Sequence, residues 1–225
     1  YHVIRSSIHL VRTTMKDRRV YLAICSISFF WAIGTVLFIQ FPPLAKNMLH
    51  ASKEVASLFL VIFSVGVAIG SVAINALLKG TVSARWSPLS VIGMGLFLLA
   101  FQEVCAIWPP HEGPEVLMNV GTFVVQPLAV PLLLTLLGIA ITGGMFVVPL
   151  YAFLTTFVEK SQTARTIAAN NIVNSGAMVV GSIATGVMTL MGVAVAQQLL
   201  VVSLGCVASA WLGYLLLRAE KEAAP

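Results

Sequence analysis

The feature that most constrains this chain is a run of 52 residues, Thr166 to Leu217, that contains no Asp, Glu, Lys or Arg. A helix needs about 20 apolar residues to cross the hydrocarbon core of a bilayer, so this run is too long for a single crossing. We expect it to divide within residues 192–198. Two transmembrane helices result, at about 167–191 and 195–217.

Four further apolar segments have the length of a membrane span. They lie at about 20–41, 55–78, 88–107 and 128–154. Pro42 and Pro43 are expected to end the first of them. In the whole chain only 9% of the residues are charged and 59% are hydrophobic, against about 25% charged residues in a typical soluble domain. The sequence therefore predicts an all-α polytopic membrane protein with six transmembrane helices.

The basic residues follow a pattern that orients these spans. Residues 1–19 are basic and carry apolar side chains at helical spacing, which is typical of an amphipathic helix on a membrane surface. This segment, the second and fourth connections between spans and the tail 218–225 hold 11 of the 13 Lys and Arg residues. The positive-inside rule then predicts that both chain ends are cytoplasmic. The charged residues expected in the two basic connections are Lys79, Arg85, Glu159, Lys160 and Arg165.

The same distribution of charge indicates which partners the chain has. Its net charge is +5, but the cations lie in short gaps between apolar runs, which favours contact with anionic membrane lipids over nucleic acid. The chain begins at Tyr1 and not at Met, and we expect that further sequence precedes it.

Polar residues gather in the hairpin 143–174, which joins the fourth and fifth spans. At about 1.5 Å per residue from Arg165, Asn174 lies roughly 13 Å deep, near the middle of a ~30 Å hydrocarbon core. Asn170 and Asn171 lie four and three residues before it, so each shares a helix face with it. Amides at this depth either form hydrogen bonds between helices or line a cavity, and the sequence leaves both interpretations open.

Small residues and prolines mark places where helices approach closely or bend. Gly66 and Gly70 form a G-x-x-x-G step in the second span, which predicts close packing against a neighbouring helix. Gly143, Gly144 and Pro149 interrupt the fourth span. We interpret them as a bend, a feature that a rocking transporter uses.

The sequence carries no arrangement typical of an enzyme or a metal site. It lacks H-E-x-x-H, G-x-S-x-G and phosphate-binding glycine motifs, and no span holds a pair of acids. The three cysteines are interpreted as small hydrophobic residues, and the four histidines lie scattered outside the apolar runs. Glu103 is the single carboxylate inside an expected span and lies near its outer end, which does not favour a proton relay. We expect no catalytic residue, no metal and no cofactor.

Four segments, in this order, resemble one family of transporters: SFFWAIGTVLFIQFPPLAKNML, FSVGVAIGS, GGMFVVPLYAFL and ARTIAANNIVN. They are similar to the C-terminal half of the lysophospholipid transporters of the major facilitator superfamily. They are most similar to the transporter portion of the members fused to acyltransferase and acyl-carrier-protein ligase domains. The resemblance extends over nearly all 225 residues. It implies that the spans are helices seven to twelve of a two-lobed transporter, with residues 1–19 as its cytoplasmic linker.

The resemblance also implies a function. The family moves lysophospholipids, chiefly lysophosphatidylethanolamine, from the outer to the inner leaflet of the bacterial inner membrane by alternating access. The partner of this chain would be the N-terminal six-helix half. The residues expected to line the cavity between the halves are Trp31, Gln40, Ser64, Tyr151, Asn171 and Asn174. Asn75 stands where the family tends to have an acid, so no ion pair with Lys79 or Arg85 is expected there.

Two other functions remain open at this stage. One is a drug or metabolite exporter of the same fold, whose transport would be inhibited by hydrophobic cations and not by lysolipid. The other is a non-transporting membrane anchor for an acyltransferase. An anchor would leave intact membranes without lysolipid flipping, and removal of the spans would leave acylation intact.

Overall fold

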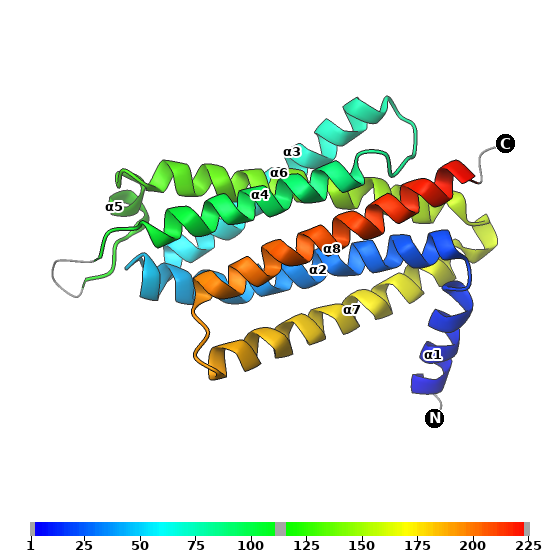
Figure 1. Ribbon diagram of the computed structural model, residues 1–225, viewed down its shortest axis with the longest axis horizontal. Helices are drawn as coiled ribbons and strands as arrows, with labels where there is room; N and C mark the ends of the chain where they lie inside the picture. Colours follow the sequence, from blue (N-terminus) through cyan, green and yellow to red (C-terminus); the bar gives the residue numbers. More distant parts are fainter. Residues whose placement is uncertain (1–2, 111–115, 223–225) are drawn as a thin grey trace.

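The computed structural model describes residues 3–110 and 116–222. Within these ranges the chain is helical and has no β-strand, and six helices are long and apolar enough to cross a membrane (Figure 1). The six are α2 (Arg18–Pro43), α3 (Lys53–Leu78), α4 (Ser87–Ala106), α6 (Ala129–Phe157), α7 (Lys160–Leu190) and α8 (Val195–Glu222). Two shorter helices are α1 (Val3–Thr14) and α5 (Val120–Val124). The all-α polytopic fold predicted from the sequence is confirmed.

The α-helical part of the first span ends at Pro43, as the sequence predicted, but the helical path of the chain does not stop there. The chain runs through both prolines and continues as a wider π-helical turn, η1 (Leu44–Met48). Proline lacks an N–H, but its fixed φ suits a helix. Hydrogen bonding resumes directly after the prolines, and the N–H of Leu49 bonds to the carbonyl of Leu44 at 3.1 Å, five residues back. The α-helix therefore ends at the prolines, and the span continues as the wider turn η1.

The long charge-free run divides after Leu190, the last residue of α7, and α8 begins at Val195. Gly192 lies in the turn with φ of 77°, a left-handed conformation that glycine adopts without steric cost. The N–H of Gly192 bonds to the carbonyl of Thr189 at 3.0 Å. This bond satisfies one of the carbonyl groups that the end of a helix leaves without a partner.

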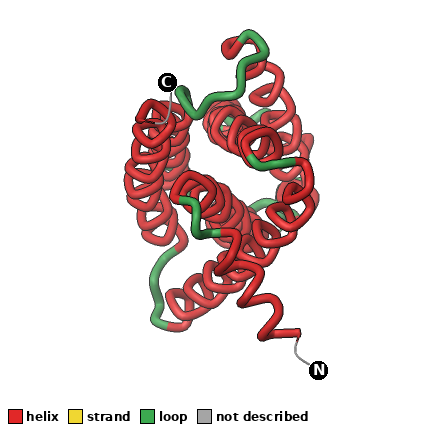
Figure 2. The backbone as a smooth tube through the Cα atoms, turned by 90° about the vertical axis from the view of Figure 1, so that its right-hand side faces the viewer, coloured by secondary structure: helices red, strands yellow, loops and turns green. Residues whose placement is uncertain are grey.

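The contacts between the spanning helices arrange them in two layers. α3 packs against α6, α6 against α2, and α2 against α7, which gives a front layer in the order α3–α6–α2–α7. The pair of α4 and α8 forms a second layer, which we name the back layer. These two helices pack against each other, and α4 also packs against α6 and α8 against α2. Figure 2 shows the bundle nearly end-on. The flanking helices α3 and α7 are the least buried of the six.

The first three spanning helices and the last three have equivalent partners. Exchanging α2, α3 and α4 with α6, α7 and α8 converts the α3–α6 pair into α7–α2 and the α4–α6 pair into α8–α2. The pairs α4–α8 and α2–α6 are unchanged by the exchange. Because α2, α3 and α4 make three crossings, the second set, α6, α7 and α8, begins at the opposite end of the bundle. This pattern of contacts is the one that two inverted three-helix repeats would give.

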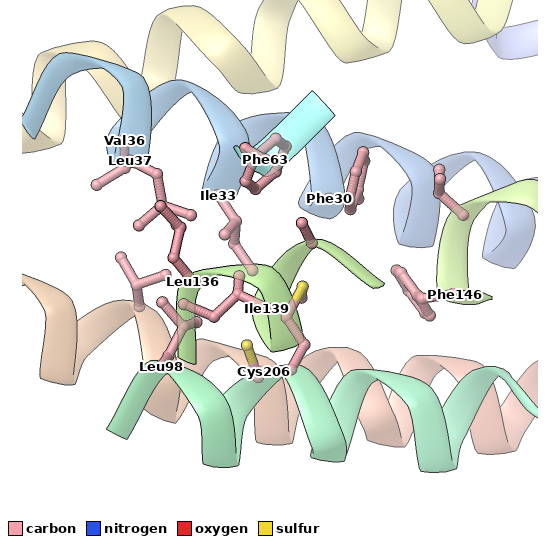
Figure 3. Packing of buried hydrophobic residues seen from close by; sticks show 14 of the residues in the cluster. Phe30, Ile33, Val36, Leu37, Phe63, Leu98, Leu136, Ile139, Phe146 and Cys206 are labelled. Atoms are coloured by element: carbon pink, nitrogen blue, oxygen red, sulfur yellow. The ribbon is translucent and has the colours of Figure 1, made fainter. Parts of the chain in front are cut away.

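The hydrophobic core lies between the two layers (Figure 3). Phe30, Ile33 and Leu37 of α2 recur at helical spacing and are buried. They meet buried residues of α6 and, from the back layer, Leu98 of α4 and Cys206 of α8. The core therefore fastens α2 and α6, the two central helices, to the pair behind them.

Glycines allow α3 and α6 to approach closely, as expected for Gly66 and Gly70. A Cβ on Gly66 would collide with the side chain of Ala140, and one on Gly70 with the backbone carbonyl of Ile141. The approach is mutual, because a Cβ on Gly144 of α6 would lie 2.6 Å from the carbonyl oxygen of Val67. Helices in lipid associate through such close contacts between small residues.

The other residues interpreted as a bend lie inside one continuous helix. A Cβ on Gly143 would lie 2.9 Å from the ring of Phe30, so this glycine gives room to α2. Pro149 is buried within α6, and the helix continues beyond it to Phe157. Because proline has no N–H, the carbonyl of Met145, one turn earlier, has no helical hydrogen bond there.

Both described chain ends lie at one end of the bundle, on the right in Figure 1, with the α3–α4 and α6–α7 connections. We name it the basic end, because 11 of the 13 Lys and Arg residues belong to its segments. Helix α1 also lies there, packs against α7, and runs steeply across the direction of the spanning helices. Its side chains Ile4 and Ile8 are exposed, as the amphipathic pattern of residues 1–19 predicted.

The glycine contacts lead to a stability prediction. We expect Gly70→Ala to lower the free energy of unfolding by about 1–3 kcal/mol, because the added methyl meets a backbone atom that cannot turn away. Gly176→Ala is the control, since a Cβ there would have no atom within 4 Å.

Unfolding can be followed with a thiol-reactive dye, because Cys105 and Cys206 are only 2% and 1% exposed. The measurement uses a Cys25→Ser background, since Cys25 is not fully buried. Equal unfolding temperatures for the Gly70 and Gly176 variants would contradict the close α3–α6 packing.

Candidate functional site

The candidate site lies on the open face of the front layer. Most of α2 is buried by α6, α7 and α8. The exposed large side chains of α2 are Tyr21, Trp31, Phe38 and Ile39, whose spacing places them along one stripe of the helix. This stripe is the most exposed part of α2, although the ring of Phe38 also packs against Phe63 of α3.

A cluster of four polar side chains joins three helices at the middle of this stripe. The hydroxyl of Ser28 on α2 donates to Oδ1 of Asn174 on α7 at 2.7 Å. Nδ2 of Asn174 donates to the hydroxyl of Tyr151 on α6 at 3.3 Å, and Nε1 of Trp31 on α2 donates to the same oxygen at 2.7 Å. We name Ser28, Trp31, Tyr151 and Asn174 the polar cluster.

The hydrogen bonds of the polar cluster leave the hydroxyl proton of Tyr151, and the second N–H of the Asn174 amide, without an acceptor among the described residues. An indole N–H and an amide NH₂ can only donate, so the Tyr151 oxygen accepts from both Trp31 and Asn174. The O–H of Tyr151 itself donates a hydrogen bond to no described residue. Ser28 and Asn174 are nearly fully buried, whereas Trp31 is 37% exposed and Tyr151 is half-buried. The free O–H therefore belongs to the exposed side of the cluster.

Three of the six residues expected to line a cavity are thus brought together: Trp31, Tyr151 and Asn174. Ser64 and Asn171 are exposed on α3 and α7 and stand outside the polar cluster. The hydroxyl of Ser64 bonds within its own helix, to the carbonyl of Leu60 at 2.8 Å. Ser64 and Asn171 are therefore exposed, but no hydrogen bond links them to the polar cluster.

Gln40 lies elsewhere, at the opposite end of the bundle from the basic end. It is 3% exposed and its amide nitrogen donates to Oε1 of Gln198 at the start of α8. Gln198 in turn donates to Thr189 of α7 at 3.1 Å and to the carbonyl of Val193 at 2.9 Å. Gln40 therefore joins α2 to the α7–α8 turn and does not line the open face.

Asn170 is buried without a hydrogen-bond partner for its side chain. It is 1% exposed, and neither polar atom of its side chain has a hydrogen-bond partner among the described residues. A buried polar group without a partner is costly, by about 1–3 kcal/mol. It lies one helical turn from Asn174, on the same face of α7 and toward the basic end.

Ser28 is the member of the cluster that the sequence did not single out. It lies three residues before Trp31, and so on the same side of α2, which is the one available signal. Serine is common within transmembrane helices because its hydroxyl can bond to the helix carbonyls. Only the position of α7 distinguishes Ser28 from its neighbour Ser26, which has no partner for its hydroxyl in the described structure.

The polar cluster contains no charged residue, and Glu103 is exposed near the end of α4, away from it. No group of three or more His, Cys, Asp or Glu residues that could hold a metal is found among residues 3–110 and 116–222. The cluster can therefore exchange hydrogen bonds with a ligand, and its rings can pack against one. The charged residues Lys79, Arg85, Glu159, Lys160 and Arg165 are all exposed at the basic end.

Comparison with known proteins does not assign the chain to a family. No protein-family model matches it. No curated protein and no solved structure matches it either.

The Ser28–Asn174 hydrogen bond can be tested by a double-mutant cycle. We expect Ser28→Ala and Asn174→Ala to be coupled by about 0.6–1.7 kcal/mol in the free energy of unfolding, the range measured for hydrogen bonds between membrane helices. The control cycle pairs Ser28→Ala with Asn171→Ala, because Asn171 is exposed and makes no bond to Ser28. The same coupling energy in both cycles would show that the Ser28–Asn174 contact is not specific.

Proposed function

We propose that this chain is one six-helix half of a membrane transporter that moves lysophospholipid from the outer to the inner leaflet by alternating access. The observation that carries the proposal is the polar cluster, an uncharged set of hydrogen-bonding groups on an open face in the middle of an apolar bundle. Lysophosphatidylethanolamine is the expected substrate, on the resemblance of the sequence to the lysophospholipid transporters of the major facilitator superfamily.

The arrangement of the helices supports a transporter. Inverted three-helix repeats are a feature of transporter folds, and substrate sites in these folds lie near the bilayer midplane. The polar cluster joins the central helices α2 and α6 to the flanking helix α7. A tilt of α7 against α2 would change its hydrogen bonds, so binding at the cluster and movement of the helices would be coupled.

The chemistry of the open face suits a single-chain lipid. A phosphate or ester oxygen of the head group accepts hydrogen bonds, and the O–H of Tyr151 is a donor without a described acceptor. The exposed side chains of Phe38 and Ile39 continue along α2 from Trp31 and offer an apolar surface to an acyl chain. The cluster has no charge to compensate the head group, which assigns that task to the N-terminal half expected opposite this face.

The orientation of the chain in the membrane is part of the proposal. The basic end carries nearly all the Lys and Arg residues and would face the cytoplasm of a bacterial cell. The open face would then be covered by the partner half, which leaves a cavity that opens alternately to either side.

Replacement of Tyr151 by Phe tests the proposed donor. In the intact protein we expect Tyr151→Phe to reduce the uptake of lysophosphatidylethanolamine by spheroplasts about tenfold, the value of one hydrogen bond to a charged group. The control is Tyr214→Phe, which removes a hydroxyl from the exposed surface of α8 in the back layer. Equal uptake by both variants would contradict a role for the Tyr151 hydroxyl.

Replacement of Asn174 by Leu tests the cluster as a whole. Leucine fills a similar volume but bonds to neither Ser28 nor Tyr151, so we expect lower uptake while the amount of protein in the membrane is unchanged. Unchanged uptake would remove the transport site from this position. Competition by hydrophobic cations and not by lysolipid would instead indicate an exporter.

A further inference from the structure

A cavity lies at the basic end, apart from the polar cluster. It has a volume of about 560 Å³ and is formed where the start of α2, the α3–α4 connection, the end of α6 and the end of α8 meet. Its lining residues are Arg19, Val82, Ser83, Arg85, Phe153, Phe157, Leu217, Glu220 and Lys221. We name it the basic cleft.

The single acid of the basic cleft is already engaged by protein groups. Glu220 accepts hydrogen bonds from the backbone N–H of Ala84 at 3.2 and 3.3 Å and from the hydroxyl of Ser83 at 3.4 Å. These bonds fasten the end of α8 to the α3–α4 connection. The carboxylate thus has structural partners in the α3–α4 connection, and among the cations of the cleft the charge of Arg19 also acts on it.

The three cations exceed the acid and are only partly used. The Arg19 guanidinium lies 4.0 Å above the ring of Phe157 and 3.6 Å from the carboxylate of Asp17. Arg85 and Lys221 form no ion pair with a described residue, although Arg85 lies 5.2 Å from the centre of the Trp86 ring. The cleft therefore keeps an excess of positive charge, with donors from three separate elements.

The inner wall of the basic cleft is apolar. The rings of Phe153 and Phe157 are stacked 4.8 Å apart with their planes 8° from parallel, and Val82 and Leu217 complete the wall. The cleft thus presents cations beside an apolar surface at the end of the spanning helices. A small soluble anion would use only the cations, whereas an amphiphile would use both.

We propose that the basic cleft binds an anionic phospholipid, whose phosphate is held by Arg19, Arg85 and Lys221 and whose first chain carbons lie against the Phe153–Phe157 stack. The cleft is at the level where head groups surround a bundle of this kind, and basic clefts between membrane helices bind such head groups. The net positive charge selects an anionic lipid over a zwitterionic one, whose ammonium group it would repel. The bound phosphate would link α2, α8 and the α3–α4 connection.

Lipid retention by the intact protein tests this inference without measuring transport. The purified, delipidated protein is titrated with phosphatidylglycerol or with phosphatidylcholine of the same acyl chains, and bound lipid is counted by native mass spectrometry. We expect phosphatidylglycerol to bind more tightly. Arg85→Gln and Lys221→Gln should each weaken its binding about fivefold, since each cation near a lipid phosphate contributes about that factor. Lys46→Gln and Lys53→Gln, at the opposite end, are the matched controls and should leave it unchanged.

The charge-preserving variants Arg85→Lys and Lys221→Arg keep the proposal falsifiable if a glutamine variant is unstable, because they should retain most of the binding. Three results would overturn it: equal binding of the two lipids, equal losses in the controls, or displacement by soluble glycerol phosphate at the concentration of the lipid. Displacement by glycerol phosphate would indicate a site for a free phosphate ester. Because the readout is lipid bound to the protein, it is independent of the transport proposal.

Discussion

The structure depends on one constraint, the need of the backbone to satisfy its hydrogen bonds without water. This need makes every apolar segment of sufficient length a helix, and it explains why the chain passes through Pro42-Pro43 as a widened turn. It also explains where polar side chains bond across helices: Ser28 bonds to Asn174, and Gln40 to Gln198, at junctions between helices.

Helices in lipid gain little from the hydrophobic effect, so their association depends on close fit and on such bonds. α3 is fastened mainly by the glycine contacts with α6, and α7 by α2 and the polar cluster. The central helices α2 and α6 are fixed from behind by α4 and α8. The result is a rigid centre with two flanking helices that each have one principal neighbour, which is the distribution of contacts that permits the flanks to move first.

The sequence alone predicted six spans because hydropathy and length are properties of each segment by itself. It placed the division of the long charge-free run within residues 192–198, and in the structure the helices are separated at 191–194. It could not tell Asn170 from Asn171, since one residue along a helix turns a side chain by about 100°, and the direction of the neighbouring helix is absent from one sequence. Asn170 and Asn174 are buried while Asn171 is exposed. The structure brings Trp31 and Tyr151 together with Asn174, whereas Gln40 bonds to Gln198 and Ser64 bonds within its own helix.

The separation of polar groups from charges has a physical rationale. An ionised side chain in the middle of the bundle would be costly whenever the site is empty, whereas amides and hydroxyls can bond to one another in the absence of a ligand. The polar cluster does this, with Ser28, Trp31, Tyr151 and Asn174 bonded in one network. Most of the charged residues are instead placed at the basic end, and the others that the structure describes, such as Lys46 and Lys53, are exposed at the opposite end. A lipid that moves between these regions would exchange ionic contacts for hydrogen bonds to neutral groups, and the weaker contacts inside the bundle would favour its release.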